Sequence, residues 1–186
     1  MKTPLCRNGV RILRPSEFKL LSSNLKPHHR IFLNTLLYSG MRFIEVQRFQ
    51  KHPEWFDEHD GFIHLPKIAI QKQKRKQMER SVRLNSLGKQ IIPFFLELDK
   101  KLPCHQTWGE NLKRWARQVD LDPIHLCAKT TRKTMESWLV STYKDRSMEI
   151  ALSQGHTTVT SLQYYLNLAF SQEDILQMKE YVGGWI

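Results

Sequence analysis

The stretch from Leu152 to Leu168, LSQGHTTVTSLQYYLNL, carries the polar residues around which the rest of the chain can be interpreted. The apolar run before it is expected to end at Gly155, because glycine adopts positive φ without steric cost. His156 follows directly, and a second helical run with threonine N-cap candidates then carries Tyr164 and Tyr165. A histidine at a helix start and a tyrosine about two turns later can face one pocket, although tyrosine pairs are also common in protein cores.

Composition narrows the class of partner. The chain has 186 residues, enough for one domain with a hydrophobic core, and its 29 Lys and Arg against 18 Asp and Glu give a net charge of +11. Such a surplus indicates a polyanionic partner, with nucleic acid as the first candidate. No apolar run approaches the roughly 18 to 20 residues that cross a bilayer, and the N-terminus lacks the apolar core of a secretory signal. We therefore expect a soluble, intracellular protein of the cytoplasm or nucleoid, with no membrane partner.

The three cysteines indicate reduced thiols. Cys6, Cys104 and Cys127 are odd in number and form no CxxC pair, which argues against a disulfide framework. A zinc site made of Cys104, His105, His125 and Cys127 is an alternative, but the spacings are not those of a usual zinc finger.

Hydrophobic periodicity predicts an α+β fold that is mainly helical. Residues 1–14 are basic and are predicted to be irregular, whereas the remainder, 15–186, forms one domain. Ser16 is the expected N-cap of the first helix, and Gly40 the expected end of the second. The expected helices span residues 16–25, 27–39, 41–52, 86–102, 107–121, 130–145, 147–153, 157–168 and 171–182.

The segment between Trp55 and Leu84 is predicted to form a small antiparallel sheet. The first extended stretch is residues 62–71, FIHLPKIAIQ, which can be extended throughout, and turn residues precede it. The second is residues 79–85, ERSVRLN, in which polar and apolar residues alternate. The basic run KQKRKQM (72–78) between the last two strands then forms a hairpin tip that can contact a phosphate backbone. A solvated charge run or a nuclear-localisation patch is the alternative interpretation. The basic side chains of this tip are Lys72, Lys74, Arg75 and Lys76.

Two arginines are predicted at helix starts. Arg42 falls in the first turn of its helix, and Arg132 follows Lys129 by three residues at the start of another. Free backbone N–H groups, the positive end of the helix dipole and a guanidinium fork together suit a phosphate. For Arg42, a surface position or an ion pair with Glu45 is the alternative.

Taken in order, these features resemble the tyrosine recombinase (phage-type integrase) family. YSGMRFIEV (38–46) resembles the first arginine box, KTTRKT (129–134) the second, and GHTTVTSLQYY (155–165) the Gly-His box followed by the nucleophile. In the family the tyrosine usually lies nine residues after this histidine, which gives Tyr165 and leaves Tyr164 to the core. The resemblance runs from about Pro15 to the end and implies that 15–186 is the catalytic domain. The family's separate N-terminal core-binding domain is not visible, so the chain is expected to be a fragment or a minimal enzyme.

The resemblance also implies roles for the residues. Arg42 and Arg132 would stabilise the phosphate, Tyr165 would attack it, and His156 could hydrogen-bond to it. The leaving oxygen would receive a proton from the hairpin, with Lys74 as the best candidate and Lys72 or Lys76 still possible. Bacterial members usually have histidine where this chain has Lys129, and lysine there is similar to integrases of archaeal viruses and plasmids. Lys129 could contact the phosphate or help to activate the tyrosine.

The expected function is therefore cleavage and rejoining of double-stranded DNA through a phosphotyrosyl intermediate. The side chains supply charge neutralisation and proton transfer, so no metal is expected. The covalent phosphotyrosyl bond conserves the energy of the phosphodiester, so no ATP is expected, and the enzyme should need no cofactor. The alternatives are a type IB topoisomerase, a noncatalytic DNA-binding module of the same fold and an unrelated basic nucleic-acid-binding protein.

Recombination would require self-association in a tetramer-like synapse. The last helix, 171–182, could dock on a neighbouring protomer there, or it could equally pack on its own domain. Glu45, three residues after Arg42, resembles the glutamate of the family's first box and is expected to orient a basic residue.

Overall fold

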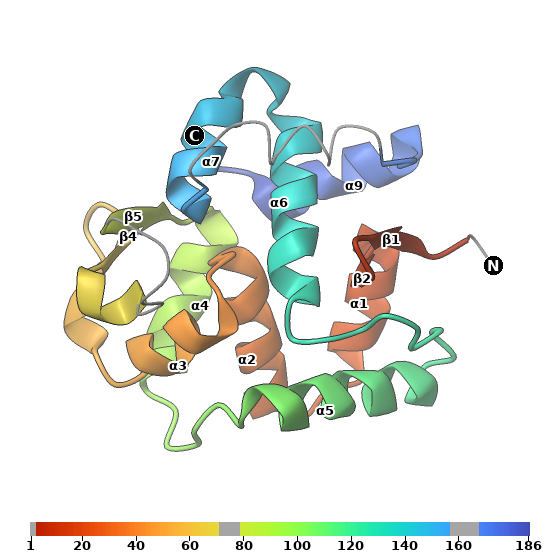
Figure 1. Cartoon of the computed structure of the whole chain (residues 1–186), viewed down its shortest axis with the longest axis horizontal. Helices are drawn as coiled ribbons and strands as arrows, with labels where there is room; N and C mark the ends of the chain where they lie inside the picture. Colours follow the sequence, from red (N-terminus) through yellow and green to blue (C-terminus); the bar gives the residue numbers. More distant parts are fainter. Residues whose placement is uncertain (1–2, 71–78, 157–167) are drawn as a thin grey trace.

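The structure, a computed structural model, describes residues 3–70, 79–156 and 168–186, and its fold is mainly helical with two small antiparallel sheets (Figure 1). The helices are α1 (Pro15–Ser23), α2 (Pro27–Tyr38), α3 (Phe43–Phe49), α4 (Ser86–Leu96), α5 (His105–Gln118), α6 (Thr130–Thr142), α7 (Ser147–Gln154) and α9 (Gln172–Val182). The strands are β1 (Leu5–Arg7), β2 (Val10–Ile12), β3 (Phe56–Asp57), β4 (Phe62–Leu65) and β5 (Arg80–Arg83). Short 3-10 turns lie at Pro53–Trp55, Lys67–Ile70 and Lys144–Arg146.

Helix α6 is the centre of the fold and packs against α2, α7, α9 and β2 (Figure 1). Its apolar side chains are fully buried, among them Trp138, whose ring lies edge-on to Phe18 with the centroids 5.9 Å apart. The indole N–H of Trp138 donates to the carbonyl of Leu13 at 3.0 Å, so the polar end of this large ring is satisfied inside the core. The predicted start of this helix near Thr130 is confirmed.

The prediction of an irregular N-terminal segment is wrong, because residues 5–12 form the β1–β2 hairpin. Its turn is Asn8-Gly9, with φ of 48° and 66°, and Asn-Gly is the preferred pair for a two-residue hairpin turn. The hairpin packs on α6: Ile12 and Leu13 are fully buried, and the backbone N–H of Leu13 donates to Thr134 Oγ1 at 3.0 Å.

The three-stranded sheet β3-β4-β5 confirms the predicted antiparallel arrangement, with Ile63 opposite Val82. Strand β4 ends at Leu65 rather than continuing to residue 71. Proline provides no N–H for a strand ladder, and after Pro66 the chain turns into a 3-10 segment. The four basic residues predicted at the hairpin tip, 72 and 74–76, lie outside the described residues.

Several helix ends differ from the predicted ends. The N-cap of α1 is Arg14 rather than Ser16, because Pro15 occupies the first helical position and Glu17 accepts the backbone N–H of Arg14 at 2.8 Å. Arg42 is the N-cap of α3 rather than part of its first turn. Helix α4 contains Pro93 and ends at Leu96, several residues before the predicted end.

The last helix, α9, packs on its own domain against α1, α4 and α6. The predicted N-cap Ser171 is confirmed, and its hydroxyl accepts the backbone N–H of Asp174 at 3.2 Å. Asp174 is buried and pairs with Arg14, while Met178 and Trp185 lie in the core. The expectation that this helix packs on its own domain is therefore confirmed. Among the described helices, none combines the length and the apolar character needed to cross a membrane.

Candidate functional site

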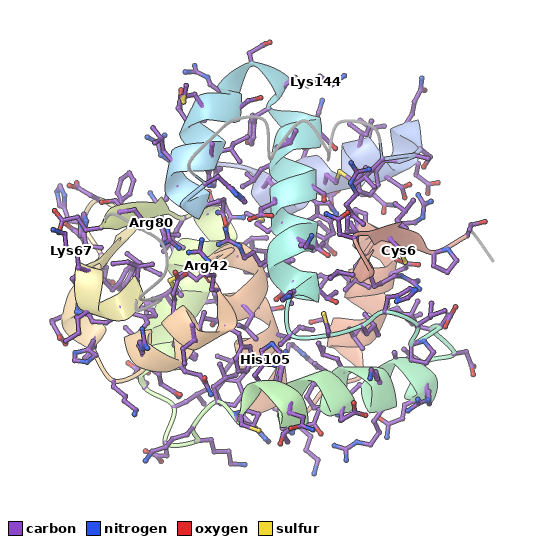
Figure 2. All side chains as sticks on the ribbon, viewed as in Figure 1. Cys6, Arg42, Lys67, Arg80, His105 and Lys144 are labelled. Carbon is purple, nitrogen blue, oxygen red and sulfur yellow. The ribbon has the colours of Figure 1, made fainter. Side chains whose placement is uncertain are left out.

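Three guanidiniums that are far apart in the sequence meet where the start of α3, the start of α6, strand β5 and the end of α7 come together. They belong to Arg42, Arg80 and Arg132. In Figure 2 the labelled Arg80 lies at the strands β4 and β5, and the labelled Arg42 lies between these strands and α6. Each of the three arginines donates to a backbone carbonyl of residues 153–155, so the C-terminal end of α7 is their common anchor.

Arg132 lies in the first turn of α6 and connects two turns of the backbone. Its Nη1 donates to the carbonyl of Gly40 at 2.8 Å, and its Nη2 donates to the carbonyl of Gln154 at 2.5 Å. The same Nη2 pairs with Glu136 Oε1 at 2.9 Å, one helical turn further on. The side chain is only 12% exposed, and its burial lowers the pKa of the guanidinium from its usual value.

Arg42 is the most exposed of the three arginines, with 28% of its side chain accessible. Its Nη1 pairs with Glu45 Oε1 at 2.8 Å, and its Nη2 donates to the carbonyl of Gly155 at 3.2 Å. The ion pair with Glu45 that was considered as an alternative is therefore present. A guanidinium carries five N–H groups, so this pairing does not exhaust the donors of Arg42.

Arg80, at the start of β5, is the member of the cluster that the sequence analysis missed. Its Nη1 and Nη2 donate to Glu45 Oε1 and Oε2 at 3.1 and 2.7 Å, and its Nε donates to the carbonyl of Ser153 at 3.1 Å. The side chain is 8% exposed. The sequence did contain a hint that Arg80 is buried. Arg80 lies two residues before the buried Val82, and side chains two residues apart in a strand point to the same face of the sheet.

Glu45 is the buried carboxylate that holds two of these arginines. Burial alone would raise its pKa, but the hydrogen bonds and charge of Arg80, together with Arg42 and Arg132, hold the pKa of Glu45 at about 2. Glu136 is the second buried carboxylate of this cluster. Three guanidiniums against two carboxylates leave the cluster with one net positive charge before His156 is counted.

His156 enters the cluster from the turn after α7. Its backbone N–H donates to the carbonyl of Ala151 at 2.8 Å, its Nε2 lies 2.9 Å from Glu136 Oε1, and its side chain is 21% exposed. The predicted helix end at Gly155 is confirmed, with φ of 68°. A Cβ at this position would lie 2.9 Å from Arg80 Nε, so glycine allows both the turn and the close approach of that arginine.

The remaining predicted site residues are not part of this cluster in the described structure. Lys129 is the exposed N-cap of α6, and its side chain makes no hydrogen bond or ion pair with a described residue. Tyr165, together with Lys72, Lys74, Arg75 and Lys76, lies outside the described residues. The structure thus brings together Arg42, Arg132 and His156 of the predicted set. It also pairs Glu45 with basic residues, as expected, and adds Arg80 and Glu136.

The alternative zinc cluster does not form. Within the described part of the chain, no three His, Cys, Asp or Glu side chains are placed to hold a metal ion. Cys104 instead caps α5, where its sulfur accepts the backbone N–H of Thr107 at 3.5 Å, and the ring of His105 lies edge-on to Phe43 with the centroids 5.6 Å apart.

The sequence matches no family model and no curated protein sequence. The fold is similar to solved structures of tyrosine recombinases. One is the integrase of the Tn1549 transposon in complex with circular intermediate DNA, with a TM-score of 0.68 and 14% sequence identity; the match covers 94% of this chain and 67% of that chain. Another is XerA recombinase, with a TM-score of 0.64 and 14% identity; the match covers 97% of this chain and 65% of that chain. A third is the XerH site-specific recombinase bound to a palindromic difH substrate, with a TM-score of 0.62 and 14% identity; the match covers 96% of this chain and 54% of that chain. This chain spans about two thirds of the first two proteins and about half of the third. The predicted fold class, a mainly helical α+β fold of the kind found in tyrosine recombinase catalytic domains with a small antiparallel sheet, is confirmed.

Proposed function

We propose that residues 15–186, with the N-terminal hairpin packed on them, form the catalytic domain of a tyrosine-type site-specific recombinase or integrase. It cleaves and rejoins double-stranded DNA through a covalent phosphotyrosyl intermediate. The observation that carries the proposal is the convergence of Arg42, Arg80 and Arg132 beside His156 at the C-terminal end of α7. The fold shared with the Tn1549 integrase, solved in complex with DNA, supports it.

The charge of the cluster fits a phosphodiester. A DNA phosphodiester carries one negative charge, which develops further on its non-bridging oxygens during in-line displacement. The cluster has one net positive charge and fixed N–H donors, so it can stabilise this charge without reorganising. Arg42, the most exposed guanidinium, is the donor best placed to contact the phosphate directly, while Arg80 and Arg132 are held deeper. Losing one such donor typically lowers the rate by about 10² to 10³.

The nucleophile in this proposal is Tyr165. A tyrosine with an unperturbed pKa of about 10 is mostly neutral at pH 7, so its hydroxyl must lose a proton as it attacks phosphorus. The departing strand oxygen must gain a proton, and Lys74 supplies it, with Lys72 and Lys76 as the alternatives. Lys72, Arg75 and Lys76 contact the DNA backbone, which makes binding weaker as salt increases.

The broader setting follows from this chemistry. The side chains supply the charge and the proton transfers, and the phosphotyrosyl bond conserves the energy of the phosphodiester, so the reaction proceeds without metal or ATP. Strand exchange requires several protomers on double-stranded DNA inside the cell. Lys129, exposed at the start of α6, provides a further cation on the DNA side.

The test is formation of a covalent adduct in EDTA. The native chain, Tyr165→Phe and Tyr164→Phe are each incubated with supercoiled DNA and with a nicked duplex, quenched with SDS and assayed for protein bound to DNA. The proposal expects an adduct that is lost in Tyr165→Phe and retained in Tyr164→Phe. Salt-sensitive DNA binding with no adduct on either substrate would identify a noncatalytic module instead. Relaxation of supercoils without joining of two sites would identify a topoisomerase.

A further inference from the structure

Glu136 is a buried carboxylate that contacts two members of the cluster through one oxygen. It lies on α6 one turn after Arg132, and its Oε1 is 2.9 Å from Arg132 Nη2 and 2.9 Å from His156 Nε2. The sequence analysis did not single out this residue, which lies in the interior of a helix between Met135 and Ser137. Its position joins the arginine that opens α6 to the histidine that follows α7.

This contact determines which nitrogen of His156 carries the hydrogen. An ionised carboxylate accepts hydrogen bonds and cannot donate them, so the ring nitrogen that faces Glu136, Nε2, must be the protonated one. In a neutral ring the other nitrogen, Nδ1, is then an acceptor. Among the described residues, Nδ1 has no hydrogen-bond partner, and 21% of the side chain is exposed. A neutral His156 held in this way cannot donate a hydrogen bond to a phosphate oxygen through Nδ1.

We propose that Glu136 is a positioning residue that fixes His156 as the Nε2–H tautomer and so makes Nδ1 the acceptor for the proton of the attacking hydroxyl. This inference rests on the proposed function and replaces the simpler expectation that His156 only hydrogen-bonds to the phosphate. As the oxygen–phosphorus bond forms and the bond to the departing strand breaks, the hydroxyl proton moves to Nδ1. The ring becomes an imidazolium whose charge is stabilised by Glu136, and religation returns the proton.

The other cationic groups of the described site are less suited to accept a proton. Guanidiniums remain protonated at neutral pH, which excludes Arg42, Arg80 and Arg132 as bases. Lys129 makes no hydrogen bond or ion pair with a described residue of the cluster. Histidine is the side chain that exchanges a proton most readily near neutral pH, and His156 is the one that the cluster contains.

The first measurement tests the tautomer without any DNA. The native chain is labelled with ¹⁵N-histidine, and the imidazole nitrogen shifts of His156 are assigned by comparison with His156→Gln. At pH 8 the proposal expects the hydrogen on Nε2 in the native chain and a mixture of tautomers in Glu136→Gln, whose amide can donate as well as accept. A native His156 with its hydrogen on Nδ1 would overturn the proposal.

The second measurement is the rate of adduct formation on a nicked duplex between pH 5.5 and 8.5 under single-turnover conditions. Glu136→Gln is expected to lower the rate about 10² fold, within the range that general-base catalysis contributes, and to change the pH profile while DNA affinity is kept. Glu136→Asp should restore part of the rate. The control is Glu149→Gln, which removes a 2.7 Å ion pair with Arg146 on the exposed side of α7 and should leave the rate unchanged.

The outcomes separate this inference from the recombinase function. If the native chain forms an adduct and Glu136→Gln keeps both its rate and its pH profile, the positioning role of Glu136 is wrong while the proposed function stands. If the native chain forms no adduct, the proposed function fails, and the tautomer measurement alone then decides whether Glu136 fixes the ring of His156.

Discussion

Arg80 and Glu45 form a two-point ion pair, with Nη1 and Nη2 of the arginine donating to Oε1 and Oε2 at 3.1 and 2.7 Å. The side chain and backbone N–H groups of Arg42 donate to the same two oxygens at 2.8 Å each. One carboxylate on α3 therefore fixes a guanidinium from strand β5 beside the guanidinium at the start of its own helix. The relative position of these two guanidiniums therefore depends on this buried carboxylate as well as on the carbonyls at the end of α7.

Glu45 should make the chain sensitive to acid. The pKa of Glu45 lies at about 2 in the folded chain, below its ordinary value of 4.5, so the unfolded state binds the proton first as the pH falls. Its contribution to stability is complete above about pH 4.5 and is lost as the pH falls through about 2. Glu45→Gln should remove this dependence and cost about 3 to 5 kcal/mol at pH 7, because Arg80 loses its buried partner. Chemical unfolding at pH 7 and pH 3 measures both effects.

The control for Glu45→Gln is Glu110→Gln. Glu110 pairs with Lys113 at 2.9 Å on the exposed face of α5, and loss of such a surface pair should cost less than about 1 kcal/mol. An acid-induced loss of stability that is the same in Glu45→Gln and in the native chain would contradict the role given to Glu45.

Arg80→Lys should lower the rate of adduct formation by about 10² to 10³ fold. A lysine presents a single ammonium and cannot reproduce two parallel bonds to Glu45 together with the bond to the carbonyl of Ser153. The matched variant is Arg83→Lys on the same strand, where the guanidinium lies 5.4 Å from the ring centre of Phe62 and makes a contact that a lysine can replace in part. Equal losses of rate in the two variants would show that Arg80 has no special role.

Gly155→Ala should be more damaging than Gly9→Ala, although both glycines have nearly the same φ, 68° and 66°. A left-handed conformation costs a non-glycine residue roughly 1 to 2 kcal/mol at either position. At Gly155 the added Cβ would also lie 2.9 Å from Arg80 Nε, whereas nothing lies within 4 Å at Gly9. Unfolding free energies and adduct rates of the two variants measure the difference. Equal costs and equal rates would mean that the packing of Arg80 on the turn does not matter.

His29 should give a second, separate pH dependence. Its ring lies 4.7 Å from the ring of Trp115, and burial, with the nearby charge of His28, lowers the pKa of His29 to about 4. Between about pH 6.5 and 4 the unfolded chain binds a proton at this position and the folded chain does not, so stability decreases as pH falls across that window. Chemical unfolding of His29→Phe, which keeps a ring against Trp115, should show a shallower decrease. An identical slope in both proteins would assign the effect to other groups.

The parts of the fold that sequence analysis predicted are those set by local signals. Gly155 ends α7 and Pro27 opens α2 because each residue favours the backbone angles found there. The N-terminal hairpin was missed although its Asn8-Gly9 turn is a strong signal, since the basic character of the segment suggested an irregular tail. A favoured turn with buried residues on the following strand outweighs surface charge.

The site could be predicted only in part, because its contacts join distant elements. Arg42, Arg132 and His156 were recognisable from their places at helix ends. Arg80 pairs with a carboxylate 35 positions away and Glu136 with a histidine 20 positions away, so neither partnership has a local pattern. An arginine on the apolar face of a strand and a glutamate inside a buried helix are the available hints, and each acquires meaning only once its partner is in place.

The central claim, that this domain cleaves DNA through Tyr165, is tested most directly by mass spectrometry of the adduct. Adduct formed in EDTA is digested with nuclease and trypsin, and the peptide that follows Arg146 and ends at Lys179, which contains both Tyr164 and Tyr165, is fragmented. We expect the remaining nucleotide on Tyr165. A nucleotide on Tyr164 or on another residue, or cleaved DNA with no modified peptide, would contradict the account.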